Sequence, residues 1–252
     1  MAFQDHFSAH AADYAFARPD YPPALIDWLT GQCQHKELAW DCATGNGQVA
    51  IPLAAGFARV VASDASAQQI AQAVPHDKIQ YSQFLAEQPP FADSSVDLVT
   101  VAQALHWFNI GDFFAAVDRV LRNKGILAVW SYDVCHIAPS IDVQVEHYYR
   151  NVVGTYWPPE RELVASKYQA IEFPYEKLAV PEFTMSRDWS CTQLCQYLAS
   201  WSATRRYQEA TGHDPIPELV KQLQPHWSEG VQKTVSWPLT VVVCRKNQTI
   251  PS

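Results

Sequence analysis

The sequence has little positive charge and no long apolar run. It contains 18 Lys and Arg residues against 26 Asp and Glu residues, which gives a formal net charge of −8 at pH 7. Duplex binding depends on a basic surface that neutralises phosphates, so this balance argues against a nucleic-acid partner. No stretch approaches the roughly 20 apolar residues that a membrane helix needs, and residues 1–20 lack the apolar core of a signal peptide. We therefore expect no membrane partner and no secretion.

Cysteine patterns that hold metals or redox pairs are also missing. The 6 cysteines are scattered without a Cys-x-x-Cys pair, which is typical of a protein in the reduced cytoplasm. No group of His, Cys, Asp and Glu has the spacing of a metal site, and no Gly-x-Ser-x-Gly motif indicates a serine nucleophile. We expect a cytoplasmic protein without a metal cofactor. The sequence does not indicate an oligomeric state.

The first half of the chain alternates short apolar strands with amphipathic helices. We expect strands at residues 38–40, 59–63, 79–82, 96–101 and 126–130, with helices after Gly47, at 66–74 and at 112–121. Strands separated by helices imply right-handed crossovers and a parallel sheet that is covered on both faces. The predicted fold class is therefore α/β, with a doubly wound and mostly parallel sheet.

The second half is rich in aromatic residues and proline. We expect helices at 142–153, 192–206 and 216–227, and a last strand at 234–244. Pro238 lies within this strand, and because proline cannot donate to a ladder it predicts a sheet edge or a bulge. We interpret this half as one or two antiparallel edge strands with a helical cover over one end of the sheet.

The most informative segment is a turn of small residues that follows the first predicted strand. Gly45 and Gly47 carry no Cβ, so a ligand can approach the backbone closely there, and the start of the next helix presents free N–H groups. This turn lies at the carboxyl end of a parallel strand, where ligands bind in such sheets. Asp64 ends the second strand, and its carboxylate can accept hydrogen bonds from both ribose hydroxyls of an adenosine.

Two cofactor classes fit this turn. The spacing of Gly45, Gly47 and Ala50 satisfies the loose dinucleotide fingerprint, which would imply a nicotinamide-dependent oxidoreductase. Asp41, before the turn, favours the other class, because a carboxylate repels a pyrophosphate and attracts the ammonium of a methionine moiety. A third alternative is a protein that binds its cofactor without catalysis and uses its aromatic second half as an interaction module.

The run from Asp41 to Gly47 resembles the first motif of class I methyltransferases, whose usual form is Asp-x-Gly-x-Gly-x-Gly. Residues 86–99 are similar to the loop and fourth strand of that family, and residues 118–127 to its entry into the fifth strand. The resemblance covers residues 35–132, and it implies a Rossmann-like fold and S-adenosylmethionine as the cofactor. By this resemblance the cofactor-binding residues are Asp41, Ala43, Thr44, Gly45, Gly47, Asp64, Ala65, Ala86, Glu87, Gln103 and Arg18.

Two residues depart from the family pattern. Ala43 replaces the first glycine of the motif, and we expect it to be tolerated with a negative φ. Leu85 stands where many relatives have an acid that bonds the adenine amino group. We therefore assign adenine recognition to backbone groups near Ala86 and to apolar packing.

The resemblance also implies how the chain is organised as one domain over residues 1–252. Residues 1–34 would form an N-terminal lid and helix, 35–132 the cofactor-binding core, 133–232 an acceptor-side helical cover with an edge strand, and 233–252 the last strand and tail. More narrowly, residues 14–22, 104–108 and 201–203 resemble trans-aconitate methyltransferases. The expected partner is a small-molecule methyl acceptor.

The acceptor side is marked by one histidine and several aromatic residues. His106 follows the fourth strand and can act as a general base or a hydrogen-bond donor, or it can simply pack against its aromatic neighbours. Arg205 and Arg206 are adjacent, so on a helix only one of them would face inward, where a guanidinium could bind a carboxylate acceptor. The alternative is that both are solvated or pair with Glu209. Further candidates for the acceptor site are Tyr14, Trp107, Trp130, Tyr132, Trp157 and Trp201.

Overall fold

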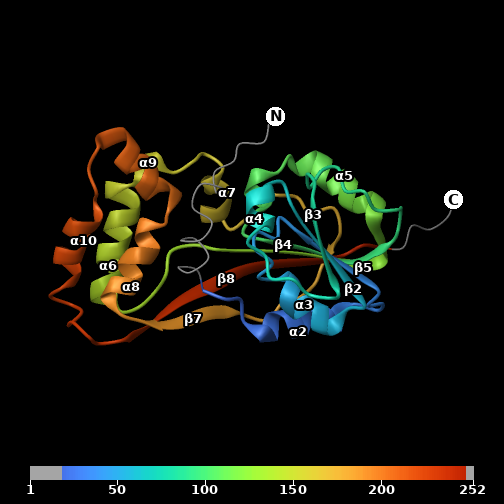
Figure 1. The fold of residues 1–252 in the computed structure, drawn as a ribbon, viewed down its shortest axis with the longest axis horizontal. Helices are drawn as coiled ribbons and strands as arrows, with labels where there is room; N and C mark the ends of the chain where they lie inside the picture. The colour runs from blue at the N-terminus through green and yellow to red at the C-terminus, as the bar shows by residue number, and fades with distance from the viewer. Residues whose placement is uncertain (1–18, 248–252) are drawn as a thin grey trace.

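The computed structural model describes residues 19–247, which form a mixed sheet with helices on both faces (Figure 1). The strand order is β3-β2-β1-β4-β5-β8-β6, and β7 pairs with β8. Strands β1 to β5 are parallel, whereas β8 is antiparallel to β5, so the predicted α/β class with an antiparallel C-terminal strand is confirmed. The strands are β1 Leu38–Cys42, β2 Arg59–Asp64, β3 Ile79–Gln83, β4 Val96–Ala102, β5 Leu121–Tyr132, β6 Glu176–Lys177, β7 Thr184–Trp189 and β8 Lys233–Arg245.

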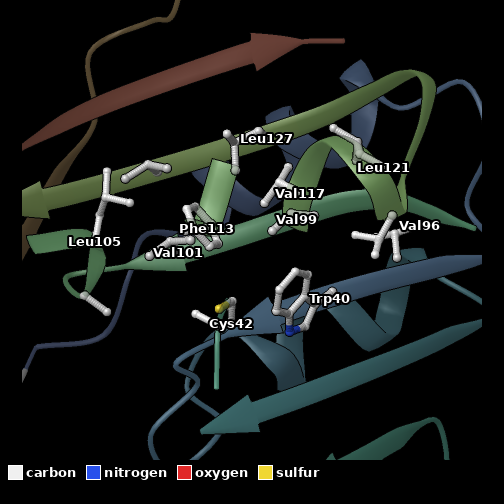
Figure 2. Close-up of a cluster of buried hydrophobic side chains, with 14 of the residues drawn as sticks. Trp40, Cys42, Val96, Val99, Val101, Leu105, Phe113, Val117, Leu121 and Leu127 are labelled. Carbon is white, nitrogen blue, oxygen red and sulfur yellow. The ribbon is translucent and has the colours of Figure 1, made fainter. Parts of the chain in front are cut away.

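Two apolar cores lie on the two faces of the sheet. Helices α2 and α3 pack against one set of alternate strand residues, which includes Trp130, and α5 covers the other set, which includes Leu127. Figure 2 shows the core under α5, where Phe113 and Val117 lie beside Val99 of β4. Strands buried on both faces are near-continuous apolar runs, which is why the sequence reveals them. The helices beside the parallel strands are α2 Pro23–Gln32, α3 Ala50–Gly56, α4 Ala67–Ile70, α5 Ile110–Val120 and α7 Arg161–Ala165.

A third apolar core belongs to the second half of the chain. Four helices pack there against β7 and the first part of β8, around buried aromatic residues such as Tyr197, Trp227 and Trp237. Figure 1 shows these helices beside the sheet, joined to it by the long strand β8. We call them the helical cover; they are α6 Pro139–His147, α8 Cys191–Ala199, α9 Ser202–Thr211 and α10 Ile216–Leu223.

Pro238 lies where β8 changes partner. Residues 233–238 pair with β7, and residues 239–245 pair with β5. Pro238 has no N–H to donate, and it lies at the end of the β7 ladder. The sequence predicted a sheet edge or a bulge at this residue.

Several predicted helices have different bounds in the structure. The helices expected at 142–153 and 216–227 end earlier, at His147 in α6 and at Leu223 in α10. The helix expected at 66–74 ends at Ile70, and tighter i→i+3 hydrogen bonds to Gln72 and Ala73 replace its last turn. The helix expected at 192–206 is two helices, because Trp201 has an extended backbone (φ −64°, ψ 139°) and begins α9 at a new angle. Periodicity continues across such a break, so the sequence pattern does not reveal it.

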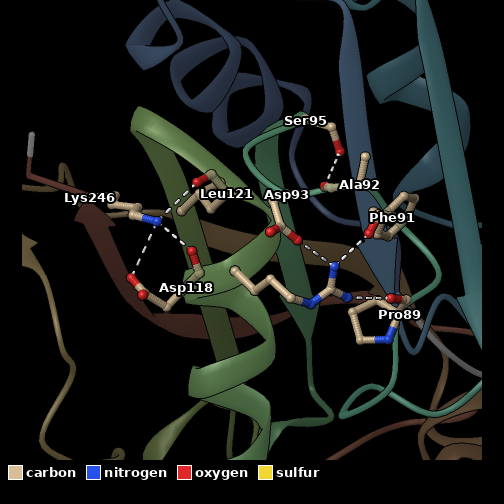
Figure 3. Close-up of polar contacts among 9 residues, drawn as sticks. Pro89, Phe91, Ala92, Asp93, Ser95, Asp118, Leu121 and Lys246 are labelled. Atoms are coloured by element: carbon tan, nitrogen blue, oxygen red, sulfur yellow. Dashed lines mark hydrogen bonds and ion pairs between the residues drawn. The ribbon is translucent and has the colours of Figure 1, made fainter. Parts of the chain in front are cut away.

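Basic side chains fasten the end of α5 to its surroundings (Figure 3). Lys246, which follows β8, donates to the carbonyls of Asp118 and Leu121, where cations are favoured by the helix dipole. Arg119 donates to the carbonyls of Pro89 at 2.7 Å and Phe91 at 2.6 Å. These contacts fix the loop before β4 and the start of β5, and so they fix the strands that carry the candidate site at their other ends.

No helix within the described residues is long and apolar enough to cross a membrane.

Candidate functional site

The strand order creates one place where the direction of winding reverses. From β1 the chain proceeds outward through β2 to β3, and then crosses back to β4, which pairs with the other side of β1. Crevices at the carboxyl ends of strands on either side of such a switch point bind ligands in open α/β sheets. Here that position lies between the turn after β1 and the residues after β4.

The turn after β1 is tied to the end of β2 by hydrogen bonds. The N–H of Thr44 donates to the carbonyl of Ser63 at 2.9 Å, and the N–H of Gly45 donates to the carboxylate of Asp64 at 2.9 Å. The other oxygen of that carboxylate accepts the N–H of Ser66 at 2.9 Å. Asp64 is half-buried. Its two hydrogen bonds hold the carboxylate in place at the carboxyl end of β2, beside the switch point.

Three residues of the turn have a left-handed backbone. Their φ values are 56° at Ala43, 58° at Gly45 and 90° at Gly47. A Cβ on Gly47 would meet the Tyr81 hydroxyl at 2.5 Å, so glycine is required there by space as well as by conformation. The expectation of a negative φ at Ala43 was wrong. The turn keeps the shape that glycine gives it in the usual motif, and the alanine adopts it at a cost of about 1–2 kcal/mol.

Asp41 lies directly beneath the turn. It is 1% exposed, and its two oxygens accept hydrogen bonds from the hydroxyls of Thr44 and Thr100. Burial raises the pKa of the Asp41 carboxyl to about 6, and the two hydroxyls oppose that shift. The side chain therefore links β1, β4 and the turn; its contact with a cofactor remains a prediction.

The other predicted cofactor residues are spread around the same end of the sheet. Ala65 directly follows β2, and Ala86 is a buried residue of the loop after β3. Leu85 is 41% exposed on that loop and offers an apolar surface there. Glu87 accepts the backbone N–H of Asn109 at 2.9 Å and so fastens the loop to the start of α5.

Gln103 has a structural role besides its predicted contact with the cofactor, which stays a prediction. Its side-chain amide bonds the backbone of Tyr132, so in the structure it joins the end of β4 to the end of β5. Two further predicted residues, Tyr14 and Arg18, lie outside the described residues.

A cavity lies between this end of the sheet and the helical cover; we call it the acceptor cavity. It brings together several predicted residues, with His106 and Trp107 from the 3₁₀ helix η2 (Leu105–Trp107) and Trp201 at the start of α9. The imidazole of His106 is 6% exposed and its Nδ1 lies 3.4 Å from the Tyr168 hydroxyl. The cavity is lined by Gln103, His106, Trp107, Tyr132, Asp133, Trp157, Pro158, Arg161, Tyr197, Ser200, Trp201, Ser202 and Arg205.

The two adjacent arginines of α9 have different positions. Arg205 lines the acceptor cavity, whereas Arg206 does not. Within residues 19–247, neither Arg205 nor Arg206 forms an ion pair, with Glu209 or any other acid. Arg205 is therefore a positive charge at the cavity that no described carboxylate neutralises.

Trp130 does not belong to the acceptor cavity, which corrects the prediction. Its ring is 0% exposed and packs on the α2 and α3 side of the sheet, edge-on to Tyr21 at a centroid distance of 5.4 Å. Trp130 and Tyr132 are two residues apart and point to the same face of β5, but only Tyr132, at the last position of the strand, lines the cavity.

Arg161 and Asp133 were not predicted from the sequence as site residues. Arg161, at the start of α7, forms an ion pair with Asp133 at 2.6 Å, and its guanidinium lies over the rings of Trp157 at 5.0 Å and Tyr149 at 5.9 Å. Its side chain is 14% exposed. Arg161 closely follows Trp157 in the sequence, but nothing in that run shows that the side chain folds back over the ring.

No group of His, Cys, Asp and Glu side chains suitable for a metal ion exists in the described part of the chain.

Comparisons with known proteins agree on one family. A methyltransferase domain family matches residues 40–129. A Dictyostelium discoideum protein named a methyltransferase is 32% identical over 252 residues, covering 97% of this chain and 96% of that protein. An uncharacterized methyltransferase of Mycobacterium tuberculosis is 35% identical over 129 residues, which is 50% of this chain and 51% of that protein.

A solved structure supports the same family. The structure of a type II methyltransferase from Anaeromyxobacter dehalogenans superposes with a TM-score of 0.86 at 33% identity, covering 92% of this chain and 99% of that one. These matches favour methyl transfer over the nicotinamide alternative for the glycine turn. Because the similarity extends over nearly the whole chain in both sequence and fold, the protein belongs to the methyltransferase family and has the Rossmann-like fold of its class I members.

Proposed function

We propose that the protein transfers the methyl group of S-adenosylmethionine to a small molecule bound in the acceptor cavity. One observation carries this proposal: the cavity and the glycine turn lie at the same end of neighbouring strands. Strand β4 pairs with β1, and Gln103, which directly follows β4, lines the cavity. Neighbouring strands are about 4.8 Å apart, so a cofactor on the turn would lie next to the cavity mouth.

The residues of the turn fit S-adenosylmethionine. The carboxylate oxygens of Asp64 at the end of β2 can accept hydrogen bonds from the ribose hydroxyls. Gly47 leaves the backbone of the turn uncovered, at a position where a Cβ would not fit. The buried acid Asp41 favours a cationic group above the turn over a pyrophosphate. When bound, the cofactor supplies an electrophilic methyl group on a sulfonium. A solved Haemonchus contortus phosphoethanolamine N-methyltransferase, in complex with phosphomonomethylethanolamine and S-adenosylhomocysteine, has the same fold, with a TM-score of 0.52 at 16% identity.

The protein's main contribution is to hold the acceptor beside that methyl group. Positioning of this kind can supply about 7–11 kcal/mol of the barrier. Trp107, Trp157 and Trp201 contribute aromatic walls that would shield a bound acceptor from water. His106 is placed to donate a hydrogen bond to the acceptor, or to accept its proton if the acceptor must lose one.

The charges at the cavity favour an acceptor with a carboxylate, and hence O-methylation. The aromatic pair Trp157 and Tyr149, which could have bound a cationic amine, is already covered by Arg161. Asp133 is paired with Arg161, so Arg205 is left as the charge that an acceptor would meet. A carboxylate is ionised at neutral pH and needs no general base, in which case His106 would act as a hydrogen-bond donor. The resemblance of residues 104–108 and 201–203 to trans-aconitate methyltransferases also supports an acid.

Calorimetry tests the cofactor. S-adenosylmethionine and S-adenosylhomocysteine should bind, and Asp64→Ala should weaken binding by about tenfold or more, because each charged hydrogen bond is worth about 1.5–3 kcal/mol. Asp93→Ala, which removes an exposed carboxylate far from the turn, is the control. Binding of NADH without binding of S-adenosylmethionine would overturn the proposal.

Transfer of a labelled methyl group tests the acceptor. Small carboxylic acids should be methylated in preference to matched alcohols and amines, and Arg205→Gln should lower kcat/KM for the acids by about 10- to 100-fold. Arg206→Gln is the matched control, since its side chain lies outside the cavity. Equal activity of the two variants on acids, or activity confined to amines, would exclude the carboxylate. Cofactor binding without transfer to any acceptor would support the non-catalytic alternative.

A further inference from the structure

We propose that Tyr168 is a positioning residue for His106: its buried hydroxyl holds Nδ1 of the imidazole and thereby fixes the orientation and tautomer that His106 presents to the acceptor cavity. The inference rests on the proposed function, because it takes His106 to act on the acceptor. Tyr168 follows α7 and is far from His106 in the sequence, so only the fold brings the two together.

The geometry of the pair supports this role. The Tyr168 hydroxyl lies 3.4 Å from Nδ1 of His106, a long hydrogen bond of the kind that tightens when a substrate binds. Tyr168 is 2% exposed and His106 is 6% exposed, so water does not compete for the contact. His106 lines the acceptor cavity, whereas Tyr168 lies behind it in the core under α5. The histidine is thus held from the side away from the acceptor.

The backbone around Tyr168 is strained to place the ring there. Lys167 and Tyr168 have φ values of 54° and 56°, and two successive left-handed residues other than glycine are costly. Hydrogen bonds from their N–H groups to Val164 at 2.9 Å and Leu163 at 2.8 Å close the end of α7 in this conformation. Strain of this kind is retained where the surrounding structure requires it, often beside functional sites.

Burial also keeps the Tyr168 hydroxyl in a suitable chemical state. It raises the pKa of the phenol, although the neighbouring Ser131 hydroxyl and Arg161 guanidinium act in the opposite direction. In our proposal the neutral phenol keeps its proton and donates it in a hydrogen bond to Nδ1, so that Nε2 carries the ring proton. The charged groups that face the cavity around His106 are Asp133, Arg161 and Arg205.

The alternative is that Tyr168 only fills the core. Tyr168→Phe distinguishes the two, because it keeps the ring and removes only the hydroxyl. Tyr175→Phe is the matched control, since that hydroxyl bonds Asp118 at 3.1 Å on the outside of α5. A core-filling tyrosine would lose nothing at His106 when its hydroxyl is removed.

Nitrogen NMR of the histidine ring provides a readout that does not depend on turnover. In the wild-type protein with S-adenosylhomocysteine added, the neutral His106 ring should be held in one tautomer. In Tyr168→Phe the ring should show both tautomers, and in Tyr175→Phe it should remain as in the wild type. With an acceptor, Tyr168→Phe should lower kcat by about two- to tenfold, the value of one hydrogen bond, and leave cofactor affinity unchanged.

The outcomes separate this inference from the proposed function. An unchanged tautomer and an unchanged kcat in Tyr168→Phe would overturn the positioning role. A mixture of tautomers in the wild-type protein would overturn it as well, even if the variant failed to fold. If no acceptor is methylated but the variant releases the tautomer, the proposed function fails and the contact between the two residues stands.

Discussion

The side-chain amide of Gln103 takes the place of a strand partner for Tyr132. Its Nε2 donates to the Tyr132 carbonyl at 3.0 Å, and its Oε1 accepts the Tyr132 N–H at 2.8 Å. The backbone of Gln103 has turned away from the sheet, with a φ of 53°, although its N–H still donates to Trp130 at 2.8 Å. The amide thus extends the pairing of β4 with β5 by one residue and sets Tyr132 in the wall of the acceptor cavity.

Removal of this amide should loosen that wall. Gln103→Leu leaves both backbone groups of Tyr132 without their partner, so we expect a loss of about 1–3 kcal/mol in the free energy of unfolding. Urea denaturation followed by tryptophan fluorescence measures it. Gln80→Leu, on the exposed face of β3, is the control and should change stability by less than about 0.5 kcal/mol. Equal losses in the two variants would show that the amide contributes no more than an ordinary surface side chain.

The left-handed backbone of Ala43 leads to a prediction of opposite sign. Ala43→Gly removes a steric cost of about 1–2 kcal/mol, partly offset by the greater freedom of glycine in the unfolded chain, so the variant should be more stable by about 0.5–1 kcal/mol. Ala71→Gly is the control, because Ala71 has a φ of −63° and should lose stability instead. A destabilised Ala43→Gly protein would mean that the methyl group of Ala43 makes contacts worth more than the strain.

The sequence predicted most strands of the sheet close to their observed positions, including the partly exposed β3 and β8. Strands β1, β2 and β4 are mostly apolar and buried, and each was expected within about two residues of its observed bounds. Strand β5 begins at Leu121, well before the expected start at residue 126, because the polar run Arg122 to Lys124 hides its first part. Strand β7 was not located, because only Met185 of its residues is buried and the rest are polar or partly exposed. An edge strand of this kind gives no alternating pattern, and its pairing with β8 depends on the folded chain.

The candidate site divides in a similar way. The glycine turn and Asp64 were predicted because their chemistry is local: a turn, a helix start and an acid at fixed spacing. Arg161 and Tyr168 could not be predicted, since their roles depend on contacts with residues far away in the sequence. The sign of φ at Ala43 is a case between these two, because the usual glycine at that position already indicated a left-handed residue.

The buried acid beneath the turn makes stability depend on pH. The pKa of Asp41 is about 6 in the folded protein, above its ordinary value of 3.8, chiefly because burial disfavours the charged form. Between pH 3.8 and about pH 6, Asp41 therefore keeps its proton in the folded state and has lost it in the unfolded state. Stability from this group is present at low pH and is lost as pH rises through 6, a difference of roughly 3 kcal/mol for a shift of about two units.

Asp41→Asn should remove this dependence, because an amide can still bond the hydroxyls of Thr44 and Thr100 but carries no charge to bury. Without cofactor, the variant should gain stability relative to the wild type as pH rises from 3.8 to about 6, and the gain should level off above that range. Urea unfolding at several pH values measures the difference, with the exposed Asp77→Asn as the control. The same substitution should weaken S-adenosylmethionine binding, since the ammonium of the cofactor loses a nearby negative charge. Parallel stability curves for wild type and variant would show that burial does not raise the pKa of Asp41.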